Sequence, residues 1–426
     1  MPSLALAPTP SPAAVFHALR GEPDRVWIDE GARGFFCWGA SEVIRGGQGA
    51  FDRARGAMRS GSAHPLGFRS GLVGWLGYEA GRWCERMPEP RGPRRLDDLR
   101  LARFEGALHY VGDRWIAIGE APYLRAADAL VGSAVEPDPC PPTGRLVDVG
   151  DPGGFLQGVV AVLEHIARGD CYQVNLARRL VVEGIEDADA AYLRLRRRSP
   201  ASHGAFLAAD GASILSNSPE LFLRLRGDRI ESRPIKGTRE LGRALELVED
   251  PKERAELTMI VDLVRNDLGR VCVPGSVRAD PRRLRELPTL LHAEQAVHGQ
   301  LRGDAYDAVG AAFPPGSVTG APKVQAMEVI RALEPVPRGV YTGAIGWFDD
   351  CGDAELSVAI RTATVVDGVA DLHVGCGLVA DSEPARELAE SQLKAKALLD
   401  AFLQPIERAT AATSEAPRTA EITAQA

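Results

Sequence analysis

A lysine and a glutamate at the ends of one predicted hairpin are the residues best suited to chemistry. Glu220 stands before an alternating apolar strand over 221–225, and Lys236 follows the return strand over 230–235. The turn between the strands brings their outer ends together, so both side chains can face one pocket. Pro234 cannot donate a backbone hydrogen bond, which predicts that the return strand ends at a sheet edge.

Lys236 has two interpretations on this segment alone. It is a solvated residue at a strand end, or it is desolvated between Ile235 and Gly237 at the mouth of a buried sheet. Burial lowers the pKa of a lysine and so favours the neutral, nucleophilic amine. The second interpretation predicts a nucleophile.

A set of carboxylates on two predicted helices forms a second candidate site. Glu387, Glu390 and Lys394 are spaced i, i+3 and i+7 in a helix predicted over 383–403, so they share one face. Glu256 lies on or beside the apolar face of another predicted helix. A surface ion pair explains the first helix on its own. Two carboxylates on one face, joined by a third, would instead form a hard-oxygen site suited to Mg²⁺.

Two polar residues lie in predicted strands that are otherwise apolar. Arg361, within 357–362, needs an anionic partner, which is either a nearby carboxylate of the protein or a substrate carboxylate. Gln173, within 171–177, is either a hydrogen-bonded core residue or a ligand contact. The sequence leaves both alternatives open.

Two glycine-bearing segments resemble anion-binding motifs. Residues 375–380 (GCGLVA) match the GxGxxA dinucleotide pattern. The elements before them look antiparallel, so the required βαβ context is missing and the match is rejected. Residues 314–323 lead into a helix that reaches Arg331, and backbone N–H groups at such a helix start can bind anions.

The elements that must position these residues alternate between helices and strands. Amphipathic helices are predicted over 151–168 and 253–268. Strands are predicted over 340–348, 355–366 and 371–374. The strands are separated by turns, which favours an antiparallel sheet.

The chain divides by composition into four stretches. Residues 1–14 are expected to form a flexible arm, and 15–145 an N-terminal part of short strands and turns. A linker rich in Pro, Gly and Asp over 136–150 leads to a larger part over 150–405. Residues 406–426 are rich in Ala, Thr and Glu and predict a disordered tail.

Overall composition excludes several classes of protein. The 426 residues are 45% hydrophobic with a net charge of −8 and no long basic run, which argues against a nucleic-acid binder. No apolar run is long enough to span a membrane, and the N-terminus lacks the basic region of a signal peptide. The seven cysteines are scattered without CxxC spacing, so neither a disulfide framework nor a zinc site is indicated and a reducing cytoplasm fits.

A series of sequence blocks resembles the chorismate-utilising enzymes from about residue 150 to 403. The blocks occur in that family's order: GDCYQVNLA, SNSPELFL, SRPIKGTR, MIVDLVRNDLGRV, PPGSVTGAPK, AIRTA and GLVADS. A weaker similarity lies at 71–82. The resemblance implies an α/β (α+β) fold in which antiparallel sheets pack face to face in a sandwich. Helices would cover the outside, and the active site would lie between sheet and helices.

Two positions sort the chain within this family. Isochorismate and salicylate synthases use a lysine to activate water where this chain has Gln173, which implies ammonia as the nucleophile. Residues 234–238 read PIKGT, as in component I of aminodeoxychorismate synthase, whereas anthranilate synthases, the alternative, have PIAGT. The implied product is 4-amino-4-deoxychorismate, a precursor of 4-aminobenzoate and folate. No glutaminase signature is present, so the implied source of ammonia is free ammonium or a separate glutamine amidotransferase subunit.

The resemblance also implies a role for each site residue. Lys236 would attack ring C2, Glu220 would protonate the leaving C4 hydroxyl, and Mg²⁺ would hold the ring carboxylate. The implied metal ligands are Glu256, Glu387 and Glu390. The implied substrate contacts are Gln173, Thr238, His292, Gly320, Tyr341, Arg361, Gly375, Gly377 and Lys394. The chain departs from the family's His-Leu-Val-Ser-like run at 292–297, which read HAEQAV.

Overall fold

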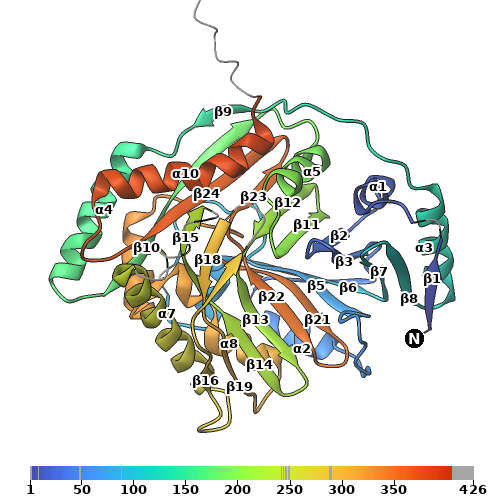
Figure 1. Cartoon of the computed structure of the whole chain (residues 1–426), viewed down its shortest axis with the longest axis horizontal. Coiled ribbons are helices and arrows are strands. Elements are labelled where there is room, and N and C mark those ends of the chain that lie inside the picture. Colours follow the sequence, from blue (N-terminus) through green and yellow to red (C-terminus); the bar gives the residue numbers. More distant parts are fainter. Residues whose placement is uncertain are drawn as a thin grey trace, which may run out of the picture.

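The architecture is an α/β sandwich in which two large antiparallel sheets face each other and helices cover their outer faces (Figure 1). The fold class predicted from the sequence is therefore confirmed. The computed structural model describes residues 2–404, apart from 8, 48, 88, 241, 243, 245–246, 248–249 and 287–289. The predicted tail, 406–426, lies outside the described residues. None of the described helices is long and apolar enough to cross a bilayer.

The first sheet carries strands from both halves of the chain. Its order is β1 (Ser3–Leu6), β8 (Arg114–Gly119), β7 (Gly106–Val111), β3 (Arg33–Cys37), β2 (Arg25–Asp29), β11 (His203–Ala209), β12 (Ala212–Ser218), β23 (Thr362–Val366), β24 (Val369–Leu378), β10 (Gln173–Glu183) and β20 (Gly320–Ala321). A further strand, β9 (Arg145–Asp148), also pairs with β10. Because β24 pairs antiparallel with both β23 and β10, no βαβ unit surrounds the GxGxxA match.

The second sheet also combines strands from both halves of the chain. Its order is β16 (Arg278–Ala279), β19 (Val297–Gln300), β14 (Arg229–Arg233), β13 (Leu221–Arg226), β22 (Ala354–Val358), β21 (Ala344–Asp349), β5 (Gly71–Leu76), β6 (Leu99–Phe104) and β4 (Glu42–Arg45). A small sheet of β15 (Ile235–Glu240), β18 (Leu290–Glu294) and β17 (Arg283–Glu286) lies beside it.

Apolar side chains form separate cores between the sheets and beneath the helices. Phe35, Leu207, Trp75 and Trp347 are buried between the two sheets. The first sheet's outer face is covered by α1 (Pro12–Ala18), α3 (Ala121–Ser133), α5 (Ala188–Arg198) and α10 (Pro384–Phe402). The second sheet's outer face is covered by α2 (Ala50–Ala57), α7 (Pro251–Gly269) and α8 (Ala305–Ala312). The helices α4 (Pro152–Ala167) and α9 (Lys323–Leu333) pack on β10 and β24.

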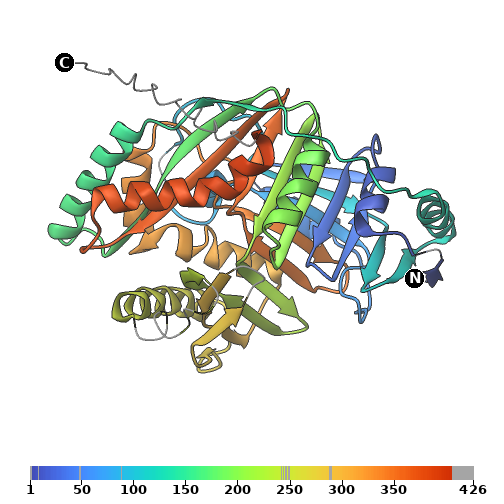
Figure 2. The ribbon, with the colours of Figure 1, turned by 45° about the horizontal axis from the view of Figure 1, so that its top comes forward.

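The N-terminal part and the larger part share both sheets. In the first sheet Ile28 of β2 pairs with Ala205 of β11. In the second sheet Val73 of β5 pairs with Trp347 of β21. The linker over 136–150 therefore joins two stretches of one folded body, and its end forms β9. Figure 2 shows the same body from another side, with α7 at its lower edge.

The prediction of a flexible arm over residues 1–14 is wrong for the described residues. Ser3 to Leu6 pair with β8 from Ile118 to Trp115, so their backbone groups complete the edge of the first sheet. Ser11 then caps α1, accepting a hydrogen bond from the Ala14 backbone N–H at 3.1 Å.

Two predicted strands are shorter than the sequence indicated. The strand expected over 340–348 begins only at Ala344, because residues 340–343 form a turn. The strand expected over 355–366 is interrupted between β22 and β23, where Arg361 has a φ of 51°. At both points the chain changes direction, which alternation of apolar residues does not reveal.

Pro234 does not mark a sheet edge as predicted. Its strand, β14, lies between β13 and β19 in the second sheet, and β15 begins at the next residue in the small sheet. The proline therefore stands where the chain passes from one sheet to another.

Candidate active site

Glu220 and Arg361 lie at two neighbouring points where the chain crosses between the large sheets. β12 belongs to the first sheet and β13 to the second, and Glu220 stands between them. Arg361 stands in the return crossing from β22 to β23. The two crossings are hydrogen bonded to each other, because the Val358 N–H donates to the Glu220 carbonyl at 3.0 Å and the Asn217 N–H donates to the Arg361 carbonyl at 3.1 Å.

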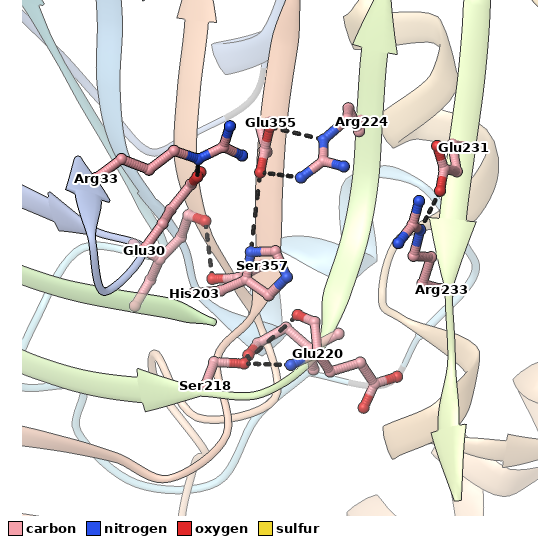
Figure 3. Close-up of polar contacts among 12 residues, drawn as sticks. Glu30, Arg33, His203, Ser218, Glu220, Arg224, Glu231, Arg233, Glu355 and Ser357 are labelled. Atoms are coloured by element: carbon pink, nitrogen blue, oxygen red, sulfur yellow. Dashed lines mark hydrogen bonds and ion pairs between the residues drawn. The ribbon is translucent and has the colours of Figure 1, made fainter. Parts of the chain in front are cut away.

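The Glu220 carboxyl group is buried, with the residue only 4% exposed. Burial raises its pKa to about 7, although the Ser317 hydroxyl, the Lys236 charge and the Ile235 backbone each act to lower it. Figure 3 shows the carboxyl end directed away from the ion pair of Glu355 and Arg224. A carboxyl group that titrates near neutrality is suited to general acid catalysis.

A partly buried ion pair joins β13, which follows Glu220, to the neighbouring strand β22. Arg224 of β13 donates to both carboxylate oxygens of Glu355 on β22, at 2.8 and 2.7 Å (Figure 3). Arg226 donates to the same carboxylate at 2.6 Å. Burial alone would raise the pKa of Glu355, but the hydrogen bonds and charge of Arg224 outweigh it and lower that pKa. This bidentate contact fixes the register of the two strands beside Glu220.

Lys236 is placed close to the other expected catalytic and metal-binding residues. The β13–β14 hairpin pairs Leu221 with Arg233, which brings the start of β15 beside Glu220 as the sequence predicted. The positive charge of Lys236 acts to lower the pKa of three glutamates: Glu220, Glu256 and Glu390. These side chains come from a sheet crossing, α7 and α10, so residues far apart in sequence converge on one amine.

Gln173 is a buried amide without hydrogen-bond partners. The residue is 1% exposed at the start of β10, and neither Nε2 nor Oε1 is hydrogen bonded to any residue that the structure describes. A β-carbon on Gly377 would lie 2.3 Å from Nε2 and 3.3 Å from Lys236 Nζ, so the amide and the amine lie together over this glycine. A buried polar group without a partner is unfavourable, so the amide is available to a ligand. The alternative of a hydrogen-bonded core residue is thereby excluded.

Gly320 brings a second strand against the same residue. It has a φ of 147°, and a β-carbon there would lie 2.1 Å from the Gln173 carbonyl oxygen. β20 pairs with β10 at Gln173 and Val174, so glycine is needed for this approach.

The carboxylates on α10 and α7 fit a divalent cation. Ligand atoms of Cys376, Glu387 and Glu390 lie within 4.8 Å of one another. Burial raises the pKa of Glu256, and the charge of Glu390 adds to this rise, so the two carboxylates repel each other. A bound cation would relieve this repulsion. Burial raises the pKa of the Cys376 thiol to about 12, so the carboxylates are the suitable donors for Mg²⁺.

Lys394 contacts both Glu390 and the backbone of β24. Its Nζ lies 2.7 Å from Glu390 Oε1 and donates to the Gly375 carbonyl at 3.1 Å. Burial opposes ionisation of Glu390, but the charge and hydrogen bond of Lys394 outweigh it and lower the pKa of that carboxyl. The i, i+4 ion pair that the sequence offered as one interpretation is present, and both of its side chains are about half exposed.

Arg361 offers a charge for an anionic ligand. Burial lowers its pKa, and no carboxylate in the described part of the chain pairs with it. Of the two partners expected from the sequence, a carboxylate of the protein is therefore excluded among the described residues. Burial of His292 lowers the pKa of its imidazole to about 4, and the charge of Arg361 adds to this decrease. His292 is thus neutral near pH 7, and its Nδ1 lies 3.2 Å from the Gly237 carbonyl oxygen.

Two further residues expected to contact the substrate, Tyr341 and Thr238, lie in a turn and in a strand. Tyr341 is buried in the turn before β21 and stacks on His373 with ring centroids 5.5 Å apart. Thr238 pairs with His292 through the backbone of β15 and β18, and its side chain lies outside the described residues.

Sequence analysis missed two residues of this region. Ser317, whose hydroxyl bonds to the Glu220 carboxyl group, lies in the turn considered only as a backbone anion site. Arg338 is 2% exposed and has no neighbour in sequence that marks its role. Ser317 contacts a segment that is distant along the chain, and Arg338 contacts Asn175 and Val318 as well as its near neighbours Glu334 and Thr342. No local pattern identifies the distant contacts.

Comparisons with known proteins agree on one family. The family model described as chorismate binding enzyme matches residues 25–400. Over 366 residues the chain is 40% identical to the aminodeoxychorismate synthase of Streptomyces griseus, covering 79% of this chain and 50% of that protein. Over 377 residues it is 36% identical to anthranilate synthase component 1 of Streptomyces coelicolor, covering 78% of this chain and 73% of that protein.

A solved structure shares the fold over almost the whole chain. The anthranilate synthase component I from Streptococcus pneumoniae superposes with a TM-score of 0.79 at 25% identity, covering 93% of this chain and 98% of that chain. The chain spans about half the length of the Streptomyces griseus relative.

Proposed function

The chain belongs to the family of chorismate binding enzymes, and on that basis we propose that it is an aminodeoxychorismate synthase of the component I type. It converts chorismate and ammonia to 4-amino-4-deoxychorismate and water. The observation that carries the proposal is the position of Lys236, whose amine lies beside Gln173 over Gly377 and near three glutamates. The PIKGT sequence around this lysine supports the same assignment.

Binding of chorismate uses the unpaired cation of the site. Arg361 takes a substrate carboxylate, and Tyr341, Lys394 and the backbone around Gly375 border the same space. Glu256, Glu387 and Glu390 would hold Mg²⁺, which when bound neutralises the ring carboxylate and draws electron density from the ring.

The first chemical step joins Lys236 to the ring. The neutral amine forms a bond to C2 while the C4–oxygen bond breaks, and the ring double bond moves between them. Glu220 gives its proton to the departing hydroxyl group, which leaves as water. The adduct carries the lysine nitrogen as a protonated secondary amine, and Glu220 is left ionised.

The second step exchanges the lysine for ammonia. Ammonia forms a bond to C4, the C2–nitrogen bond breaks, and Lys236 leaves as the neutral amine. The new ammonium group then returns one proton to Glu220, so both residues are restored. Gln173 is placed to contact the incoming ammonia, because its amide lies beside the Lys236 amine. A separate glutamine amidotransferase supplies the ammonia in this proposal.

Anthranilate synthase component I is the second candidate, because relatives with that name show similar identity. Incubation of the purified chain with chorismate, Mg²⁺ and ammonium distinguishes the two. We expect chorismate to be consumed without fluorescent anthranilate, and 4-aminobenzoate to form only after a lyase is added. Direct release of anthranilate and pyruvate would overturn the proposal. Lys236→Ala protein serves as the control for contaminating activity.

A further inference from the structure

Arg338 is a buried arginine whose guanidinium group makes five hydrogen bonds. Nε and Nη2 donate to the two carboxylate oxygens of Glu334, at 2.9 and 2.6 Å. Nη2 also donates to the Asn175 carbonyl at 2.6 Å. Nη1 donates to the Val318 carbonyl at 3.0 Å and to Thr342 Oγ1 at 3.1 Å. An arginine has five N–H donors, so its hydrogen-bonding capacity is filled.

The three segments that Arg338 joins each carry residues of the proposed pocket. Asn175 lies two residues after Gln173 on β10. Val318 lies between Ser317, which bonds to Glu220, and Gly320. Thr342 follows Tyr341. The first two segments are also hydrogen bonded to each other, because the Asn175 N–H donates to the Thr319 carbonyl at 2.8 Å. Arg338 contacts all three segments through one side chain.

The turn that presents Tyr341 depends most on this support. Thr342 has a φ of 61°, a conformation that is unfavourable for a β-branched residue. Its backbone N–H donates to the Ala359 carbonyl at 2.8 Å, and its hydroxyl accepts from Arg338. The guanidinium carbon of Arg338 lies 5.9 Å from the centre of the Tyr341 ring. The same ring stacks on His373.

The partners of Arg338 are themselves fixed. Glu334 Oε1 also accepts from the Ala177 N–H of β10 at 2.8 Å. Glu79 accepts from the backbone N–H groups of Arg338 and Gly339, at 2.8 and 3.0 Å. Glu79 belongs to the short helix η1 (Tyr78–Trp83), so the N-terminal part of the chain holds the same arginine.

We propose that Arg338 is a positioning residue for the substrate pocket, acting through Tyr341, Ser317 and Gln173 rather than by touching the substrate. The inference rests on the proposed function for its substrate, and on the geometry above for its mechanism. A lysine at this position retains the charge but cannot form the bidentate contact with Glu334 while reaching both other carbonyl groups. Disorder of the three segments, with the fold retained, is the expected consequence.

Arg338→Lys is compared with Arg103→Lys, a matched control. Arg103 is equally buried and pairs with Asp350 at 2.7 Å. It lies on β6, next to β4, the edge strand of the second sheet. Both variants should lose thermal stability. Only Arg338→Lys should lower kcat/KM for chorismate, by about 10- to 100-fold, because displacements of about 1 Å at an active site have effects of this size. Hydrogen–deuterium exchange should rise in peptides covering 173–178, 316–321 and 339–344 in that variant only.

Equal kinetics and equal exchange in the two variants would overturn the inference. If wild-type protein does not consume chorismate, the proposed function fails, and the exchange comparison still decides whether Arg338 orders the three segments. If Arg338→Lys does not fold, Thr342→Ala removes one of the five acceptors. That variant should show a smaller loss of kcat/KM with faster exchange around residue 342, and wild-type values for both would overturn the inference.

Discussion

The side-chain amide of Gln173 lies directly against the backbone of Gly377, on the strand next to it in the first sheet. A β-carbon on this glycine would be 2.3 Å from Gln173 Nε2 and 3.3 Å from Lys236 Nζ. A contact of 2.3 Å cannot be accommodated without movement, and a residue that is 1% exposed has little room to move.

Gly377→Ala should therefore impair catalysis while leaving the fold intact. We expect kcat to fall by about 100-fold, because the amide and the amine are both displaced. Steady-state kinetics with ammonium, alongside circular dichroism, provide the measurement. Gly132→Ala is the control, since a β-carbon at that helical position meets nothing within 4 Å. Equal activity in both variants would show that the contact over Gly377 is unimportant.

Lys236→Ala should abolish turnover of chorismate. Loss of the nucleophile is expected to lower kcat by at least about 100-fold without unfolding the protein. Intact-mass measurement of wild-type protein incubated with chorismate and Mg²⁺ but no ammonia should reveal an adduct equal to chorismate less one water. The adduct should be missing from the variant. Wild-type turnover in Lys236→Ala would exclude the covalent role.

The pH dependence of kcat/KM should report the ionisation of Glu220. Its pKa is raised to about 7 by burial, and only the protonated form can act as the acid. Activity should therefore be retained below pH 7 and decline as the pH rises through this value. Ser317→Ala removes a hydrogen bond that lowers the Glu220 pKa, so the decline should move to higher pH. A profile that is flat through neutrality in wild-type protein would contradict Glu220 as the acid.

Burial of Glu220 should also reduce stability at higher pH. Below pH 4.5 the carboxyl group is protonated in both folded and unfolded chains, and there is no penalty. As the pH rises from 4.5 to about 7, the unfolded chain releases the proton first, so the folded state loses stability, by on the order of 3 kcal/mol once both forms are ionised. Glu220→Gln should accordingly raise Tm above pH 7. A Tm difference that does not diminish toward acid pH would contradict this account.

Removal of divalent metal should abolish activity, and Mg²⁺ should restore it. Glu256→Gln and Glu387→Gln should each raise the Mg²⁺ concentration for half-maximal activity by at least about 10-fold. Glu383→Gln is a matched control at the N-cap of α10, because its side chain is 59% exposed and pairs with Arg386. Calorimetric titration with Mg²⁺ tests the same ligands without substrate. Full activity in a chelating agent would exclude the metal site.

Local patterns in the sequence predicted the parts of the site that lie close together in the chain. The β13–β14 hairpin placed Glu220 near Lys236, because turn residues and alternation of apolar residues fix the pairing of adjacent strands. Helical spacing placed Glu387, Glu390 and Lys394 on one face, because residues three or four apart in a helix lie on the same side.

The remaining features depend on contacts between distant segments. The pairing of Ile28 with Ala205 and of Val73 with Trp347 leaves no mark in either strand's own sequence, because many partners satisfy an apolar strand equally well. Arg338 was missed for a related reason, because two of its five hydrogen bonds go to the carbonyl groups of Asn175 and Val318, which approach it only after folding. The other three go to Glu334 and Thr342, each four residues away. The sandwich itself was inferred by resemblance to a family and not from periodicity.

The sharing of both sheets between early and late strands bears on synthesis of the protein. β2 emerges from the ribosome long before β11, and β5 long before β21, which ends at Asp349. β2 lacks its partner until β11 is made, and β5 lacks its partner until β21 is made. Open strand edges of this kind are surfaces on which nascent chains aggregate. A chain that ends before β21 therefore lacks strands that both large sheets need, since β22, β23 and β24 also follow β21.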